Sequence, residues 1–80
     1  MEPKYLKLLK KLLQAEGKDA EEICGTILMT KLELPHFSPS LVSMLEVYYK
    51  SIASEYCTHK TDYNKSKLEK IISEIEGLLF

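Results

Sequence analysis

The sequence contains no arginine and no tryptophan, and all eleven of its basic residues are lysine. Arginine is the usual side chain for bidentate recognition of phosphate, guanine or carboxylate, so the chain lacks the commonest tool for reading a nucleic-acid sequence. The eleven basic residues stand against twelve acidic ones, which gives a formal net charge of −1. This balance excludes a general polyanion binder and, equally, a mimic of a polyanion.

Long apolar runs are also missing. No run approaches the ~20 residues that a membrane-spanning helix needs, and four lysines interrupt the apolar stretch at the N-terminus. We therefore expect neither a transmembrane segment nor a signal peptide. Three glycines, three prolines and 45% hydrophobic residues in a chain of 80 are typical of one small globular domain, and we expect a single domain over 1–80.

Cysteine is limited to Cys24 and Cys57, and each lies within an apolar helical pattern. Free cysteine behaves as a small hydrophobe, so we predict two buried thiols, with one disulfide between packed helices as the alternative. Reduced thiols favour a cytoplasmic location. These cysteines with His36 and His59 lack the two tight ligand pairs of a structural zinc site, so we expect neither a metal nor another cofactor.

Apolar residues recur at helical spacing in four segments of the chain. The spacing predicts helices over 3–16, 19–32, 39–58 and 66–79. The predicted fold class is all-α, a compact four-helix domain with a long third helix at its centre. Between Gly25 and Leu34 the β-branched residues also permit a short strand, but a single strand would have no partner to pair with.

Residues typical of helix ends mark the boundaries of these segments. Ser38 followed by Pro39 is the pattern of an N-cap and first helical residue. Two capping boxes are predicted, one from Asp19 to Glu22 and one from Ser66 to Glu69. Gly17 stands where a glycine commonly ends a helix, after the first segment.

The third predicted helix is apolar over more than half of its circumference, which favours a position with neighbours on two sides. Placing one stripe inward leaves Met44 and Val47 on its flank. The predicted core face consists of Leu41, Leu45, Tyr48, Tyr49, Ile52 and Tyr56.

Motifs for catalysis are absent from the sequence: it has no P-loop, no glycine-rich dinucleotide fingerprint and no nucleophile elbow. We expect a protein that is not an enzyme. Excess apolar residues in so small a chain favour an interface, so the predicted function is a protein–protein interaction module. A small regulator or inhibitor that binds a larger protein, such as a virus or mobile element encodes, would fit.

The predicted partner-binding residues are apolar or aromatic residues near the third helix and the C-terminus: Val47, Tyr48, Tyr49, Tyr56, Leu79 and Phe80. Tyrosine is enriched at interface centres. We also expect a homodimer, because a two-fold axis lets one apolar patch cover its own copy.

Two alternatives to this function stay open. One face of the first helix carries Lys4, Lys7, Lys10 and Lys11, and this lysine face predicts an alternative function in contact with nucleic acid. The other alternative comes from a resemblance. The stretch Lys31-Leu32-Glu33-Leu34-Pro35, placed before a tyrosine-rich amphipathic helix, resembles small helical immunity proteins against bacteriocins. That resemblance implies a helical protein similar to these bacteriocin immunity proteins.

Overall fold

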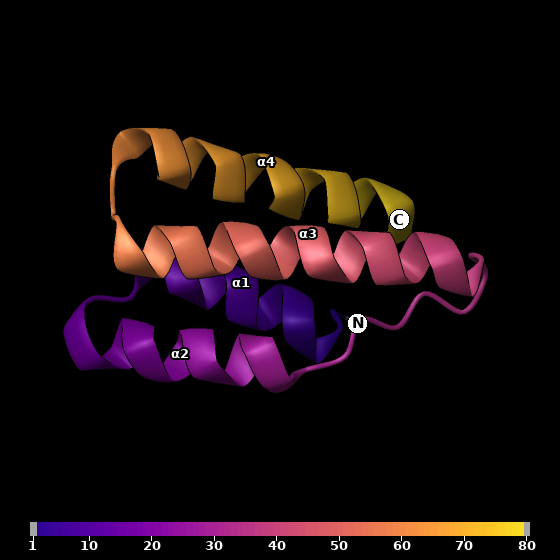
Figure 1. The fold of residues 1–80 in the computed structure, drawn as a ribbon, viewed down its shortest axis with the longest axis horizontal. Coiled ribbons are helices and arrows are strands. Elements are labelled where there is room, and N and C mark those ends of the chain that lie inside the picture. Colours follow the sequence, from indigo (N-terminus) through magenta and orange to yellow (C-terminus); the bar gives the residue numbers. More distant parts are fainter. Residues whose placement is uncertain (1, 80) are drawn as a thin grey trace.

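Four α-helices make up the protein, in a computed structural model that describes residues 2–79 (Figure 1). Their bounds are α1 Lys4–Gln14, α2 Gly17–Met29, α3 Pro39–Thr58 and α4 Asp62–Leu79. No strand occurs within residues 2–79, so the prediction of an all-α four-helix fold is confirmed. Over the same residues, no helix combines the length and the apolar character needed to cross a membrane.

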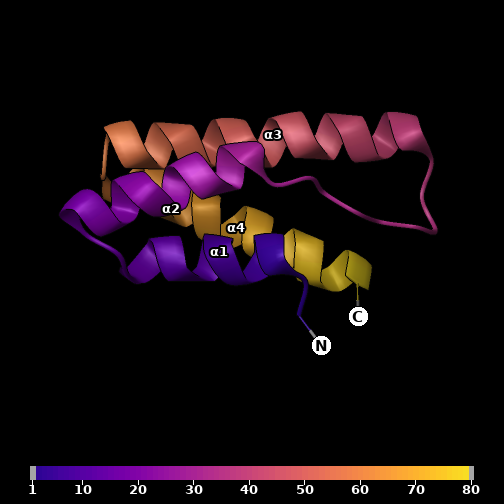
Figure 2. The ribbon, with the colours of Figure 1, turned by 90° about the horizontal axis from the view of Figure 1, so that it is seen from below.

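Consecutive helices run antiparallel, and each packs against two others (Figures 1 and 2). Helices α1 and α3 both contact α2 and α4, so the four helices surround a shared core instead of enclosing one central helix. The third helix does have neighbours on two sides, and with 20 residues it is the longest. Its first turns extend beyond the ends of the other helices (Figures 1 and 2).

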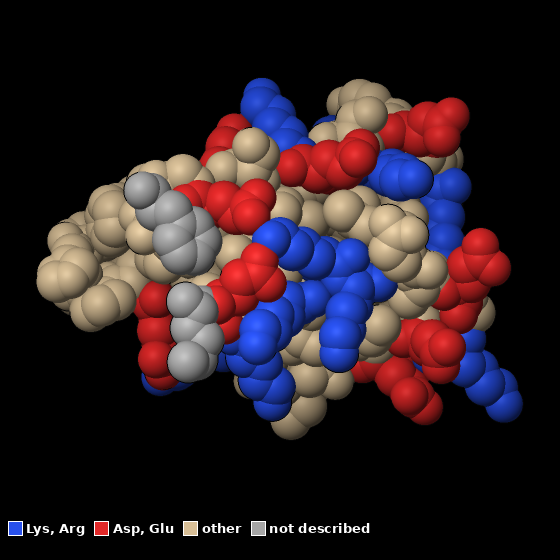
Figure 3. Space-filling view, turned by 180° about the vertical axis from the view of Figure 1, so that it is seen from behind, with Lys and Arg blue, Asp and Glu red and all other residues tan. Residues whose placement is uncertain are grey.

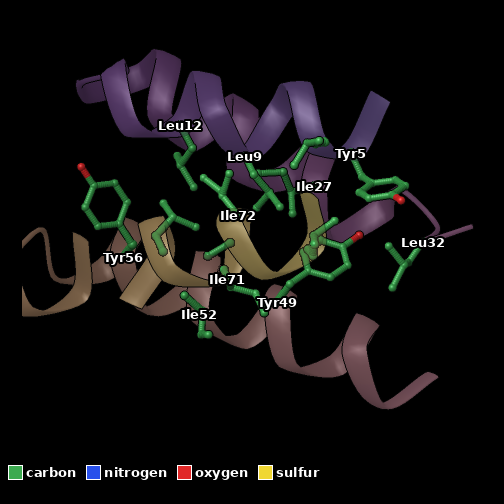
Figure 4. Packing of buried hydrophobic residues seen from close by; sticks show 14 of the residues in the cluster. Tyr5, Leu9, Leu12, Ile27, Leu32, Tyr49, Ile52, Tyr56, Ile71 and Ile72 are labelled. Carbon is green, nitrogen blue, oxygen red and sulfur yellow. The ribbon is translucent and has the colours of Figure 1, made fainter. Parts of the chain in front are cut away.

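The core is built from the apolar sides of all four helices (Figure 4). Because each helix is amphipathic, its apolar side is shielded from water only when it faces the other helices. The largest fully buried side chains are Leu6, Leu9 and Leu12 of α1, Ile27 of α2, Tyr49 of α3, and Leu68, Ile71 and Ile75 of α4.

The second helix ends at Met29, earlier than the predicted residue 32. The reason is that Leu32 and Leu34 are both buried. Residues two apart lie on opposite sides of a helix but on the same side of an extended chain, so only an extended segment puts both leucines into the core. The prediction that helix continues to this point was wrong.

The connection between α2 and α3 is held to the helices by hydrogen bonds. The Tyr49 hydroxyl donates to the carbonyl oxygen of Thr30 at 3.1 Å, and the Tyr5 hydroxyl donates to that of Glu33 at 3.4 Å. The Leu32 amide donates to a carboxylate oxygen of Glu46 at 2.9 Å. These bonds satisfy backbone groups that would otherwise lack partners, because an extended segment has none of its own.

Two of the predicted helix starts are wrong and one is confirmed. The Ser38 side chain accepts from the Leu41 amide at the start of α3, as predicted. No side chain caps α2, which begins at Gly17 with Asp19 inside its first turn. The fourth helix begins one turn before Ser66, because the Thr61 hydroxyl accepts from the amide of Asn64 at 3.1 Å.

The same substitution at two glycines is expected to have opposite effects on stability. Gly17 has a φ of +58°, where a side chain is strained, whereas Gly25 lies inside α2 with open space around its Cα. We expect Gly17→Ala to lower the free energy of unfolding by about 1 kcal/mol and Gly25→Ala to raise it by up to about 1 kcal/mol. Urea denaturation of the two variants measures both effects, and equal stability of the two would contradict the helix boundaries.

Candidate functional site

An apolar surface covers the first half of α3, on the side turned away from the core. The buried residues Tyr49, Ile52, Ala53 and Tyr56 define the inward side of this helix. Four residues from three successive turns occupy the outward side, and we call them the α3 patch. They are Leu41, Met44, Val47 and Tyr48, which are 39%, 71%, 70% and 51% exposed.

The α3 patch is lined up by helical spacing, since Leu41, Met44 and Tyr48 follow the i, i+3, i+7 pattern of one helix face. A shallow groove of about 680 Å³ runs along this side of the helix. It is lined by the patch together with Ser43, Leu45 and Ser51. Further along the same side the exposed Glu55 follows, so the apolar surface ends there.

Charge is nearly absent from the chain segment that carries the α3 patch. Between Leu34 and Ser54 the only charged residues are Glu46 and Lys50. These two form an ion pair at 3.1 Å, and Glu46 also accepts from the Leu32 amide. The hydrogen bond from Leu32, followed by the bond from Lys50, holds the pKa of the Glu46 carboxyl below its usual value. Both charged side chains are therefore engaged in contacts within the protein.

The lack of charge at this end is visible on the surface of the molecule. Figure 3 shows no charged side chain at its left-hand end, where the start of α3 projects beyond the other helices. The remainder of that view carries both signs of charge. An uncharged surface distinguishes this end, and the α3 patch contributes exposed apolar side chains to the same part of α3.

The structure divides the predicted partner-binding residues into two groups. Val47 and Tyr48 belong to the α3 patch, whereas Tyr49 and Tyr56 are buried in the core and offer no contact surface. The predicted core face of the third helix was therefore wrong for Leu41 and Tyr48, which are exposed. The physical reason is that α2 and α4 cover the side of α3 that carries Tyr49, which turns the neighbouring Tyr48 outward.

The predicted partner-binding residues at the C-terminus, Leu79 and Phe80, are not part of the α3 patch. Leu79 is partly buried and packs against the core, while the side chain of Leu78 is exposed. Phe80 lies outside the described residues. Leu79 is thus better explained by packing than by contact with a partner.

The lysine face is only partly available to an anion. Lys4, Lys7 and Lys11 are exposed, but the ammonium of Lys10 bonds to the carboxylates of Glu2 and Glu76. Those hydrogen bonds raise the pKa of Lys10. In Figure 3 the lysines gather over α1 with acidic side chains around them. Lys4, Lys7 and Lys11 form no ion pair within residues 2–79, and three such lysines make a weak site for phosphate groups.

The two cysteines meet where α2 packs on α3, and both are free thiols. The Cys24 thiol donates to the carbonyl oxygen of Ala53, and the Cys57 thiol donates to that of Ala20, each at 3.8 Å. Burial, and then the contact with Cys24, raise the pKa of Cys57 to about 12. Within residues 2–79, no group of three His, Cys, Asp or Glu side chains could hold a metal ion.

A signal for the patch was present in the sequence but lay in charge spacing, not in apolar periodicity. The twelve residues from Leu34 to Leu45 include no Asp, Glu, Lys or Arg, in a chain that is 29% charged. Leu41 and Met44 fall inside this stretch and were missing from the predicted partner-binding residues. An exposed helix face of a small domain usually carries charge, so its absence marks this segment.

Comparisons of the chain with protein-family models, with curated proteins and with solved structures found no match. The function therefore has to be argued from the α3 patch itself.

Proposed function

We propose that this protein is a non-enzymatic interaction module that binds another protein through the α3 patch. The observation that carries the proposal is the cluster of four exposed apolar side chains on consecutive turns of α3, in a segment whose only two charges pair with each other. Together these side chains expose on the order of 450 Å² of surface, which is within the range of the largest patch on a typical monomer, a patch that is often functional.

The composition of the α3 patch also supports contact with a protein. Aromatic residues and methionine are enriched in interface cores, and charged residues are depleted there. Tyr48 offers a large ring with few rotatable bonds, and Met44 adapts its shape to an uneven surface. The patch combines both residue types around one shallow groove.

A small regulator or inhibitor of a larger protein fits this arrangement, because the patch occupies one projecting end of a short helical bundle. The protein would act by covering a surface of its partner. The free thiols of Cys24 and Cys57 favour action in a reducing compartment such as the cytoplasm. The resemblance to immunity proteins stays a prediction, which the α3 patch neither favours nor opposes.

Affinity capture from the native host tests the proposal. The bait is compared with a double variant, Met44→Lys with Val47→Lys, and with Tyr63→Lys as a matched control. Tyr63 is as exposed as Val47, at 70%, but lies on α4. We expect a protein that the native chain and Tyr63→Lys retain and that the double variant loses. Retention that is equal for all three baits would contradict the proposal.

The nucleic-acid alternative predicts a different result, and a polyanion column measures it. With Lys10 engaged by two carboxylates and a net charge of −1, we expect the protein to elute at low salt. Reversing the charge of Lys7 to Glu should then change the elution little. Strong retention that falls steeply with salt, and that Lys7→Glu abolishes, would instead favour contact with nucleic acid.

A further inference from the structure

We propose that a second copy of this chain covers the α3 patch, with the two α3 helices packed antiparallel about a two-fold axis near Met44. This inference rests on the proposed function, because it takes the α3 patch to be a protein contact surface. It adds the identity of the occupant in the free protein; a larger partner would compete with the second copy for the same surface.

The first argument is that the four patch residues carry no charge that would repel a second copy. In a two-fold interface each surface meets itself, so any charge close to the axis meets its own like charge. Leu41, Met44, Val47 and Tyr48 carry no charge, and the nearest charged pair, Glu46 with Lys50, is neutral as a unit. The lack of charge makes the surface complementary to itself.

The second argument is the spacing of the side chains along α3. Leu41 and Tyr48 lie one on each side of Met44, three and four residues away. When two such helices run antiparallel about an axis near Met44, Leu41 of each copy lies opposite Tyr48 of the other. A small side chain then faces a larger one on both sides of the axis, which is an arrangement that lets helix surfaces interdigitate.

The third argument concerns access to this part of the helix. The first turns of α3 extend beyond the other helices of the bundle (Figure 2). Ser43 and Ser51, which line the groove, are small enough to let a second helix approach closely. A second α3 can therefore lie along the patch without contacting the lysine-bearing surface of α1.

The area that a dimer would bury is sufficient for a reversible association. Two patches contribute on the order of 1,000 Å², which lies just below the ~1,200 Å² of stable specific interfaces and in the range of weak, transient ones. An interface of this size is typical of a dimer that dissociates on dilution. A membrane surface fits less well, because helices that lie on membranes carry lysines beside the apolar face, and this segment has only Lys50, which is paired.

Sedimentation equilibrium over micromolar to millimolar concentrations tests the inference. We expect the mean mass of the native chain to rise from 9.2 kDa toward twice that value. Val47→Lys places a charge within the contact, so we expect its dissociation constant to increase at least about 30-fold. Met44→Ser is a second patch variant with an uncharged side chain, and we expect it to weaken the dimer in the same direction. Tyr63→Lys is the control and should dimerise like the native chain.

Three results would overturn the inference. They are a native mass that stays at 9.2 kDa throughout the range, a Val47→Lys or Met44→Ser variant that dimerises like the native chain, and a Tyr63→Lys variant that loses the dimer as fully as Val47→Lys. Failure here is distinguishable from failure of the proposed function. If the chain is monomeric but still captures a protein through Met44 and Val47, the proposed function stands and the patch binds a different protein.

Discussion

Replacing Tyr49 with alanine is expected to remove most of the stability of the fold. Its side chain is fully buried, its ring lies 6.2 Å from that of Tyr5, and its hydroxyl donates to the carbonyl oxygen of Thr30. Truncating a buried aromatic residue costs about 3–5 kcal/mol, whereas a domain of this length has a total stability of roughly 4–12 kcal/mol. Thermal denaturation followed by circular dichroism should show Tyr49→Ala largely unfolded, or melting more than about 15 °C below the native chain.

The neighbouring tyrosine provides the control for this prediction. Tyr48 belongs to the α3 patch and is exposed, so we expect Tyr48→Ala to change the free energy of unfolding by no more than about 0.5 kcal/mol. The measurement is made at micromolar concentration, where association contributes little. Equal destabilisation by the two variants would contradict the orientation of α3 and with it the position of the patch.

The second large effect is a loss of stability at alkaline pH. Burial is the first cause that raises the pKa of Tyr49, and negative charge on Glu46 adds to it. Burial raises the pKa of Cys57 as well, to about 12. Both groups keep their protons in the folded state at a pH where the unfolded chain has already lost them. Their contribution to stability is therefore complete below about pH 9 and is lost as the pH rises toward the folded-state values.

The size of this alkaline effect follows from proton linkage. A fully buried group that keeps its proton lowers the free energy of unfolding by at most about 1.4 kcal/mol per pH unit once the unfolded chain is ionised. Tyr49 is fully buried whereas Cys57 is only partly buried, so we expect stability to fall as the pH rises above about 10, mainly through Tyr49. Urea midpoints measured across pH test this. Tyr49→Phe removes one ionisable group, so its stability should fall less steeply with pH, and an unchanged slope would contradict the assignment.

The sequence predicts those parts of the fold that depend on strong local signals. Ser38 and Pro39 define the start of α3 because a side-chain cap and a fixed φ act within one turn. The start of α2 was misplaced because this helix begins at Gly17 without a side-chain cap, and the start of α4 because similar residues compete for the same role. Thr61 and Ser66 are both capping residues, and the choice of Thr61 goes with the buried Asn64, whose side-chain amide donates to the carbonyl oxygen of His59 at 2.8 Å.

The orientation of α3 could not be predicted from its sequence. Its apolar residues cover two faces, one that includes Tyr49 and one that includes Tyr48, and periodicity alone does not say which face turns inward. Contact with α2 and α4 makes that choice. For the same reason the sequence indicated that an apolar surface would remain exposed, and placed Val47 on it correctly, but assigned Leu41 to the core.

The central claim is that the outward side of the first half of α3 is where this protein makes contact with others. Methyl-resolved spectra of the isotope-labelled protein, recorded while unlabelled protein is added from micromolar to millimolar concentration, test it most directly. We expect the methyl signals of Met44 and Val47 to shift or broaden, while those of the buried Ile71 and Ile75 stay in place. Shifts confined to Leu28, Met29 or Leu78, which are also exposed, would contradict the claim. A spectrum without any concentration dependence would contradict the second copy as the occupant.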